Sequence, residues 1–196
     1  MMDQKCSFPN TGTLKMKLNK KTAVMARQGV LLTTEKNWDG GMAQNSEKVA
    51  VTFYLSAQEL KVEVDAPFHD DPAPPGPAGE LDRLWQYEVT ELFLLGAEGH
   101  YLEIELGPHG HYLILHLSGI RQVSNTLQPT HCSTHITDCR WQGALTLALE
   151  QSILPFTHVN AYAIHGLGAK RRYLSAFPVP GERPDFHQPH YFGCLE

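Results

Sequence analysis

Residues 84–119, LWQYEVTELFLLGAEGHYLEIELGPHGHYLILHLSG, decide the fold. They contain three strand-like runs joined by short turns that carry glycine. Within them, residues 101–106 (YLEIEL) alternate strictly, which places the apolar side chains at 102, 104 and 106 on one face of a strand and Glu103 and Glu105 on the other. Such a strand has one face in an apolar core and one face able to meet water or a ligand.

The rest of the chain continues the β pattern with almost no helical periodicity. A loop with five prolines and two glycines occupies residues 67–83, because proline removes backbone donors and fixes φ. Further strands are predicted at 49–55, 60–66, 144–150, 159–165 and 172–177, and residues 178–194 are expected to wrap over the surface. About eight or more short strands separated by turns predict an all-β fold, an antiparallel β-sandwich of jelly-roll or immunoglobulin-like scale.

The chain divides into a basic head and an acidic body. Residues 1–36 carry seven Lys or Arg against two acidic residues, a balance of +5, so a whole-chain charge of -5 leaves -10 on residues 37–196. The head shows no sustained period and is expected to be a disordered extension, although its composition also allows a weak organelle-targeting segment. Residues 37–196 are expected to form a single β-sandwich domain, since a chain of this length can bury its own core.

Charge and cysteine usage argue against several classes of function. An acidic body makes a nucleic-acid partner unexpected, because phosphate binding needs a basic face. The start lacks an apolar signal-peptide core and no run of about 18 apolar residues exists, so neither secretion nor a membrane partner is expected. The four cysteines form no CxxC pair, which fits a reducing compartment. We expect a soluble cytoplasmic protein, and no pattern bears on its oligomeric state.

Seven short motifs follow one another along the body: WDGG, APFHDDPAPP, LWQYEVTELFL, YLEIELGPHGHYL, AIHG, KRRY and PDFH. Together they resemble an uncharacterised intracellular protein family that is itself similar to family-nine carbohydrate-binding modules and to the wider group of DOMON-like β-sandwiches. The resemblance covers residues 37–192. It implies a carbohydrate-binding-module-like sandwich with a sugar- or cofactor-binding ancestry, while the function must still be argued from a site.

The resemblance also marks the first candidate site residues. Trp85, Glu88 and Glu91 match the tryptophan and acidic pair of such modules, in which a ring stacks on a sugar and carboxylates accept hydrogen bonds from its hydroxyl groups. Four further polar side chains are expected around them, namely Glu103, His109, His165 and Arg172. The prediction is non-catalytic binding of a carbohydrate or similar small polar ligand on a polar, aromatic sheet face, with no catalytic residue, metal or cofactor.

Two other classes of function stay open. Glu91 and Glu103 could be the acid–base pair of a small hydrolase or isomerase with His165 or His109, since paired carboxyl groups serve glycoside hydrolysis. His109 and His111 lie on one side of an extended chain and, with His165 or Glu103 as a third ligand, have the pattern of a metal site built on strands, although a turn with exposed rings is the favoured explanation. The third class is a protein-interaction domain whose polar face is solvated and binds no small ligand.

Overall fold

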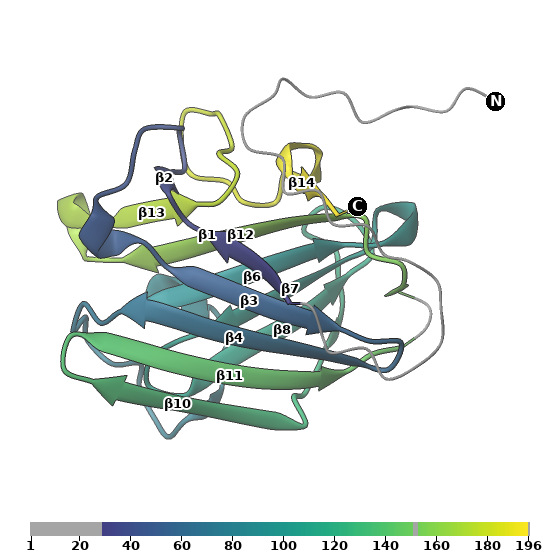
Figure 1. The fold of residues 1–196 in the computed structure, drawn as a ribbon, viewed down its shortest axis with the longest axis horizontal. Helices are drawn as coiled ribbons and strands as arrows, with labels where there is room; N and C mark the ends of the chain where they lie inside the picture. The colour runs from purple at the N-terminus through teal and green to yellow at the C-terminus, as the bar shows by residue number, and fades with distance from the viewer. Residues whose placement is uncertain (1–28, 151–152, 196) are drawn as a thin grey trace.

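The computed structural model describes residues 29–150 and 153–195, which form a sandwich of two sheets (Figure 1). One sheet has five strands in the order β1 (Val30–Thr33), β3 (Ala50–Leu55), β4 (Glu59–Pro67), β11 (Arg140–Ala148) and β10 (His131–Thr137). The other has nine, with the path β2 (Lys36–Asn37), β13 (Arg172–Ser175), β12 (His158–His165), β6 (Val89–Leu95), β7 (Tyr101–Leu106), β8 (His111–Leu117) and β5 (Gly79–Glu80), plus β14 (Gly193–Cys194) beside β12 and β9 (Val123–Thr126) beside β8.

Strand pairing in both sheets is antiparallel except for β5 with β8. The helical segments of the described residues are short 3-10 turns, namely η1 (Asn45–Glu47), η2 (Leu84–Gln86), η3 (Ala97–Gly99), η5 (Gly168–Lys170) and η6 (Pro189–Tyr191). Within the described ranges, no helix is long and apolar enough to cross a membrane. The predicted antiparallel β-sandwich is confirmed.

The main core lies between the two sheets. The apolar side of β7 enters it as predicted, with Leu102, Ile104 and Leu106 all buried. Trp141 of β11 and Phe53 of β3 enter the same core from the five-stranded sheet. Full burial of one such side chain contributes roughly 1.5–3 kcal/mol, so the alternation of a few strands is enough to hold the layers together.

The outer face of the nine-stranded sheet is covered, which corrects the expectation of a face open to water. All six residues of β7 are buried, the glutamates included. The cover is the segment 176–195 after β13, which we call the C-terminal strap: its Phe186 stacks on Tyr162 with ring centroids 3.8 Å apart, and its Phe192 lies edge-on to Phe93 at 5.7 Å. These rings form a second apolar core, and burying them excludes water from the polar groups beneath.

The folded part begins before residue 37, where the sequence placed its boundary. β1 pairs with β3 over four residues and β2 pairs with β13, so residues 30–37 contribute an edge strand to each sheet. The boundary was placed too late because two short strands show too few alternations to be recognised. The prediction of a disordered head otherwise concerns residues 1–28, which lie outside the described residues.

Candidate functional site

The seven predicted site residues lie in separate places rather than in one pocket. Trp85 is 41% exposed on η2, and His109 packs edge-on against Phe68 with ring centroids 5.8 Å apart. The other five form two groups, Glu88 with His165 and Arg172 at one end of the sandwich, and Glu91 with Glu103 beneath the strap.

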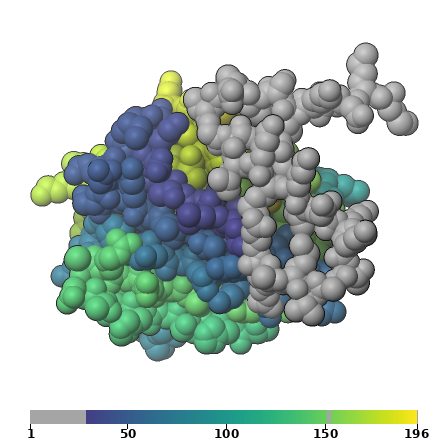
Figure 2. Space-filling model, in the orientation of Figure 1, coloured from purple at the N-terminus to yellow at the C-terminus, as the bar shows by residue number. Residues whose placement is uncertain are grey.

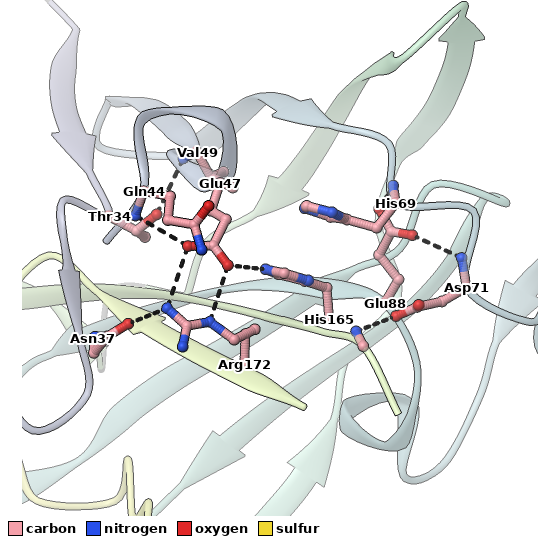
Figure 3. A network of polar contacts seen from close by, with 11 residues as sticks. Thr34, Asn37, Gln44, Glu47, Val49, His69, Asp71, Glu88, His165 and Arg172 are labelled. Carbon is pink, nitrogen blue, oxygen red and sulfur yellow. Dashed lines mark hydrogen bonds and ion pairs between the residues drawn. The ribbon is translucent and has the colours of Figure 1, made fainter. Parts of the chain in front are cut away.

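The first group belongs to a polar network at one end of the sandwich (Figure 3). Glu47 of η1 accepts hydrogen bonds from Arg172 Nε at 2.9 Å and from the Gln44 amide at 3.0 Å, and Arg172 also donates to Asn37 Oδ1 at 2.8 Å. Burial works against ionisation of Glu47, but the hydrogen bonds from Arg172 and Gln44 lower its pKa below the usual value. An ionised Glu47 thus joins η1 to β2 and β13.

Two histidines continue this network. His165 stacks on His69 with ring centroids 3.6 Å and planes 3° apart, and its Nε2 lies 3.5 Å from Glu47 Oε1. Burial and the adjacent His69 lower the pKa of His165 to about 4. The pair therefore stacks as neutral rings at neutral pH, which avoids placing two cations face to face.

Glu88 closes the network on the other side of the histidines (Figure 3). Its carboxyl group accepts hydrogen bonds from the amides of His69 at 3.0 Å and Asp71 at 3.4 Å, and burial raises the pKa of Glu88 to about 7. A group of this kind can transfer protons near neutrality. However, the crevice beside Glu88 and His165 measures about 10 Å³, which is room for one water molecule. The network therefore acts as a structural clamp between elements.

The second group is a cluster of three carboxyl groups, Glu91, Glu103 and Glu105, which we call the carboxyl cluster. Glu91 and Glu105 face each other across β6 and β7, and Glu103 is the next residue on the same face of β7. Their exposed fractions are 2%, 3% and 0%. Within the described residues, both oxygens of Glu105 and Oε2 of Glu103 lack a hydrogen-bond partner.

Burial decides the protonation of this cluster. It raises the pKa of Glu103 to about 7, and it raises the pKa of Glu91 and Glu105 well above the usual value with the help of the neighbouring carboxyl groups. Like charges directly opposite on a sheet are destabilising, and the low-dielectric surroundings amplify that cost. The cluster therefore retains protons at neutral pH.

One imidazole of the strap stands beside the cluster. His187 Nδ1 lies 2.8 Å from the hydroxyl of Tyr101, and its Nε2 lies 3.8 Å from Glu103 Oε2. Burial lowers the pKa of His187 to about 4, so this ring is neutral as well. The acid–base alternative predicted His165 or His109 at this place; in the described residues the imidazole beside Glu103 is His187, and that predicted constellation is not assembled.

A hollow of about 440 Å³ opens on the outer face of the five-stranded sheet, the face turned toward the viewer in Figures 1 and 2. Strand register arranges its outward side chains in two rows across β3, β4, β11 and β10. One row is Thr52, Glu63, Ala144 and Ser133, and the other is Ala50, Asp65, Gln142 and His135. Each row presents short or polar side chains at intervals of roughly 4.8 Å, the spacing of neighbouring strands.

The acids of the hollow, unlike the carboxyl cluster, have cationic partners. Asp65 Oδ1 accepts hydrogen bonds from Arg140 Nη2 at 2.6 Å and Nε at 3.0 Å, and Glu63 bonds to Lys61 and to the hydroxyl of Tyr54. The hydrogen bond from Lys61 lowers the pKa of Glu63. Two carboxylates and two cations leave this surface without net charge. In the part of the chain that the structure describes, the side chains of Thr52, Gln142 and His135 make no hydrogen bond and are free to meet a ligand.

The sequence reasoning missed the hollow and also missed Glu47, His69 and Glu105. The signal for the hollow was present: every second residue of 50–54, 61–65, 133–135 and 142–144 is small or polar. Those positions become one surface only through cross-strand register, which the sequence does not show. Within residues 29–150 and 153–195, no three His, Cys, Asp or Glu side chains are grouped so that they could hold a metal ion.

Comparisons with known proteins find relatives over most of the chain. The UPF0462 protein C4orf33 homolog of Danio rerio is 39% identical over 164 residues, which cover 79% of this chain and 83% of the relative. The UPF0462 protein C4orf33 of Homo sapiens is 36% identical over 167 residues, which cover 81% and 83%. No family model matches the chain.

Solved structures share the fold at low sequence identity. A proposed carbohydrate-binding protein from Bacteroides uniformis superposes with a TM-score of 0.64 at 17% identity, covering 86% of this chain and 85% of that one. A family-nine carbohydrate-binding module from Caldicellulosiruptor kristjanssonii, in complex with cellotriose, gives a TM-score of 0.51 at 11% identity, covering 85% and 80%. The sandwich is therefore of the family-nine type, as the resemblance implied.

Proposed function

The chain belongs to the UPF0462 family, and from this premise we propose that it binds a neutral carbohydrate or similar small polar ligand, without catalysis, in the hollow of the five-stranded sheet. The observation that carries the proposal is the hollow itself, two rows of short and polar side chains around about 440 Å³. Ligand pockets typically measure about 300–1,000 Å³, so a mono- or disaccharide fits.

The chemistry of the hollow favours an uncharged, hydroxyl-rich ligand. Glu63 and Asp65 are ionised acceptors held in place by their cations, so they can accept hydrogen bonds from hydroxyl groups without attracting a charged ligand. Gln142 and His135 add donors and acceptors, and the methyl group of Ala144 gives an apolar contact for C–H groups. Support from the fold is coarser: two structures of the similar module hold cellotriose and glucose.

The test is isothermal titration of the full chain with a panel of neutral mono- and oligosaccharides, wild type against Ala144→Trp. Ala144 lies in the middle of its row, so an indole there fills the hollow from the outer sheet face. We expect at least one sugar to bind the wild type and Ala144→Trp to weaken it about tenfold or more, the cost of about 1.4 kcal/mol of lost contacts.

Two variants serve as controls. Ala148→Trp adds the same indole to the exposed end of β11, outside the hollow lining, and should bind as the wild type does. Trp85→Ala removes the exposed indole of the site expected from the sequence, so loss of binding here with Ala144→Trp unaffected would move the site to Trp85. If no sugar on the panel binds the wild type, the proposed function is wrong.

A further inference from the structure

The middle of the C-terminal strap, residues 180–192, is held to the sheet mainly by side-chain contacts. Phe186 and Phe192 seat on rings of the sheet, His187 meets the hydroxyl of Tyr101, and Asp185 pairs with Arg121 at 2.7 Å. The two ends of the strap are bonded to the sheet by its backbone: Ala176 N donates to Ala161 O at 2.8 Å, Leu195 N donates to Thr157 O at 2.7 Å, and β14 pairs with β12 over two residues. A segment held by side chains and little ladder pairing can separate from the sheet without breaking the sandwich.

Beneath the strap, closure leaves a carboxyl oxygen without a hydrogen-bond partner. Oε2 of Glu103 is buried and has no hydrogen-bond partner among the described residues, and the nearest imidazole nitrogen of the strap, Nε2 of His187, lies 3.8 Å away. A polar group of this kind destabilises the fold while it is kept from water without a partner. The sheet face therefore favours solvation, and the aromatic contacts of the strap oppose it.

The charged and titratable groups around the cluster do not neutralise it by direct bonds. Arg171 attracts Glu91, but its guanidinium donates to the carbonyl groups of Gly166 and Trp85. Arg121 attracts Glu103 while it is paired with Asp185. The remaining titratable groups that surround the cluster are Tyr101 on β7, Tyr162 on β12, His111 on β8 and His187 on the strap.

We propose that the C-terminal strap is a proton-controlled cover, closed while the carboxyl cluster holds its protons and opened when the cluster releases them. Closure places three carboxyl groups on adjacent strand positions under a layer of aromatic rings. If they ionise in place, two of them carry like charges directly opposite each other. Opening the strap returns the charges to water, and it is the condition under which Glu91 and Glu103 can contact a ligand.

The direction of the pH response follows from the groups that change. In the open arrangement the carboxyl groups are solvated and ionise near their usual pKa of 4.5, whereas closure raises the pKa of all three. Rising pH therefore favours opening. His187 acts in the opposite direction, because closure lowers its pKa to about 4 and opening lets it take up a proton in acid. Above about pH 6.5 the imidazole is neutral in both arrangements, and only the carboxyl groups respond.

Hydrogen–deuterium exchange of the full chain tests the proposal between about pH 6.5 and 8.5, where each proton released on opening raises the opening constant about tenfold per pH unit. After correction for intrinsic exchange, peptides from the C-terminal strap (176–195) should lose protection with rising pH. Peptides from β4 and β11, which lie in the other sheet, serve as the internal reference and should keep theirs.

Two sets of variants complete the test. In Glu91→Gln with Glu105→Gln, and separately in Glu103→Gln, the pH response of the strap should shrink, while Glu182→Gln on the exposed loop should retain it. Phe186→Ala should lower the exchange protection of the strap at both the low and the high end of this pH range. The proposal is wrong if wild-type strap protection is independent of pH, if β4 and β11 lose protection in parallel, or if the glutamine variants respond as the wild type does.

Discussion

Replacing Glu103 with glutamine should remove a pH-dependent loss of stability. Burial raises the pKa of this carboxyl group from 4.5 to about 7 in the folded protein, and in the unfolded chain it ionises at its usual value. Stability from a raised pKa is fully present below the unfolded value and is lost as pH rises through the folded value. The contribution of Glu103 therefore falls between about pH 4.5 and 7 and stays low at higher pH.

The size of the effect follows from the same two values. A rise from 4.5 to about 7 corresponds to about 3 kcal/mol, and Glu103 is almost fully buried, so solvent screening does not reduce it much. Glutamine keeps the shape of the side chain and carries no titrating proton. Glutamine at 103 also takes a negative charge away from Glu91. Because Glu103 is one cause of the raised pKa of Glu91, this second effect also favours the variant as pH rises.

The measurement is urea unfolding of wild type and Glu103→Gln at intervals from about pH 5 to 8, compared as the difference in unfolding free energy. The difference should change by about 3 kcal/mol in favour of the variant as pH rises. Taking the difference cancels titrating groups that do not interact with Glu103, such as Glu88, whose pKa is also about 7. A difference that is constant with pH, or that changes equally in Glu182→Gln, would refute the assignment of a buried protonated carboxyl group.

Three further predictions follow from the packing and the polar network. Glu47→Gln should lower the unfolding free energy by about 1–2 kcal/mol, measured by thermal unfolding, because it leaves the half-buried guanidinium of Arg172 without its carboxylate. Gly143→Ala should cost about 1–3 kcal/mol in urea unfolding, since its Cβ would lie 2.7 Å from Leu106 Cδ2 in the core. His187→Asn should flatten the loss of stability that wild type shows as pH falls from about 6.5 toward 4, because the unfolded chain takes up a proton on His187 in this range while the buried ring stays neutral; an unchanged acid limb would contradict this.

The architecture could be predicted because strand alternation is local. The run 101–106 shows its apolar side without knowledge of any partner, and the hairpin of 49–55 with 60–66 is found as β3 and β4. The burial of the other side of this strand depends on the contact between Phe186 and Tyr162, which are far apart in the sequence. Local alternation cannot predict such a contact. One signal was available: Phe93 and Tyr101 stand on the same face as Glu91 and Glu103. Two large rings among acids indicate a second buried layer rather than a solvated face.

The candidate site could be predicted in residue type and less well in place. Glu88, His165 and Arg172 do belong to one network, but its other half, Glu47 and His69, comes from distant loops that have no periodic signal. Long-range polar contacts of this kind depend on the backbone conformation at the ends of strands and turns. Element ends are the least regular part of a β-sandwich.

The two polar sheet faces differ in how their acids are balanced, and this difference decides what each face can do. On the five-stranded sheet, Glu63 bonds to Lys61 and Asp65 bonds to Arg140 of the neighbouring strand, so the charges persist at the surface. On the nine-stranded sheet, the cross-strand partner of Glu91 is Glu105. These carboxyl groups can carry charge only when water reaches them. The ligand proposed for the hollow is therefore expected to bind with little dependence on pH near neutrality. Under the proposed opening of the strap, a ligand reaches the carboxyl cluster only after its protons are released, so ligand access on that face is expected to rise with pH.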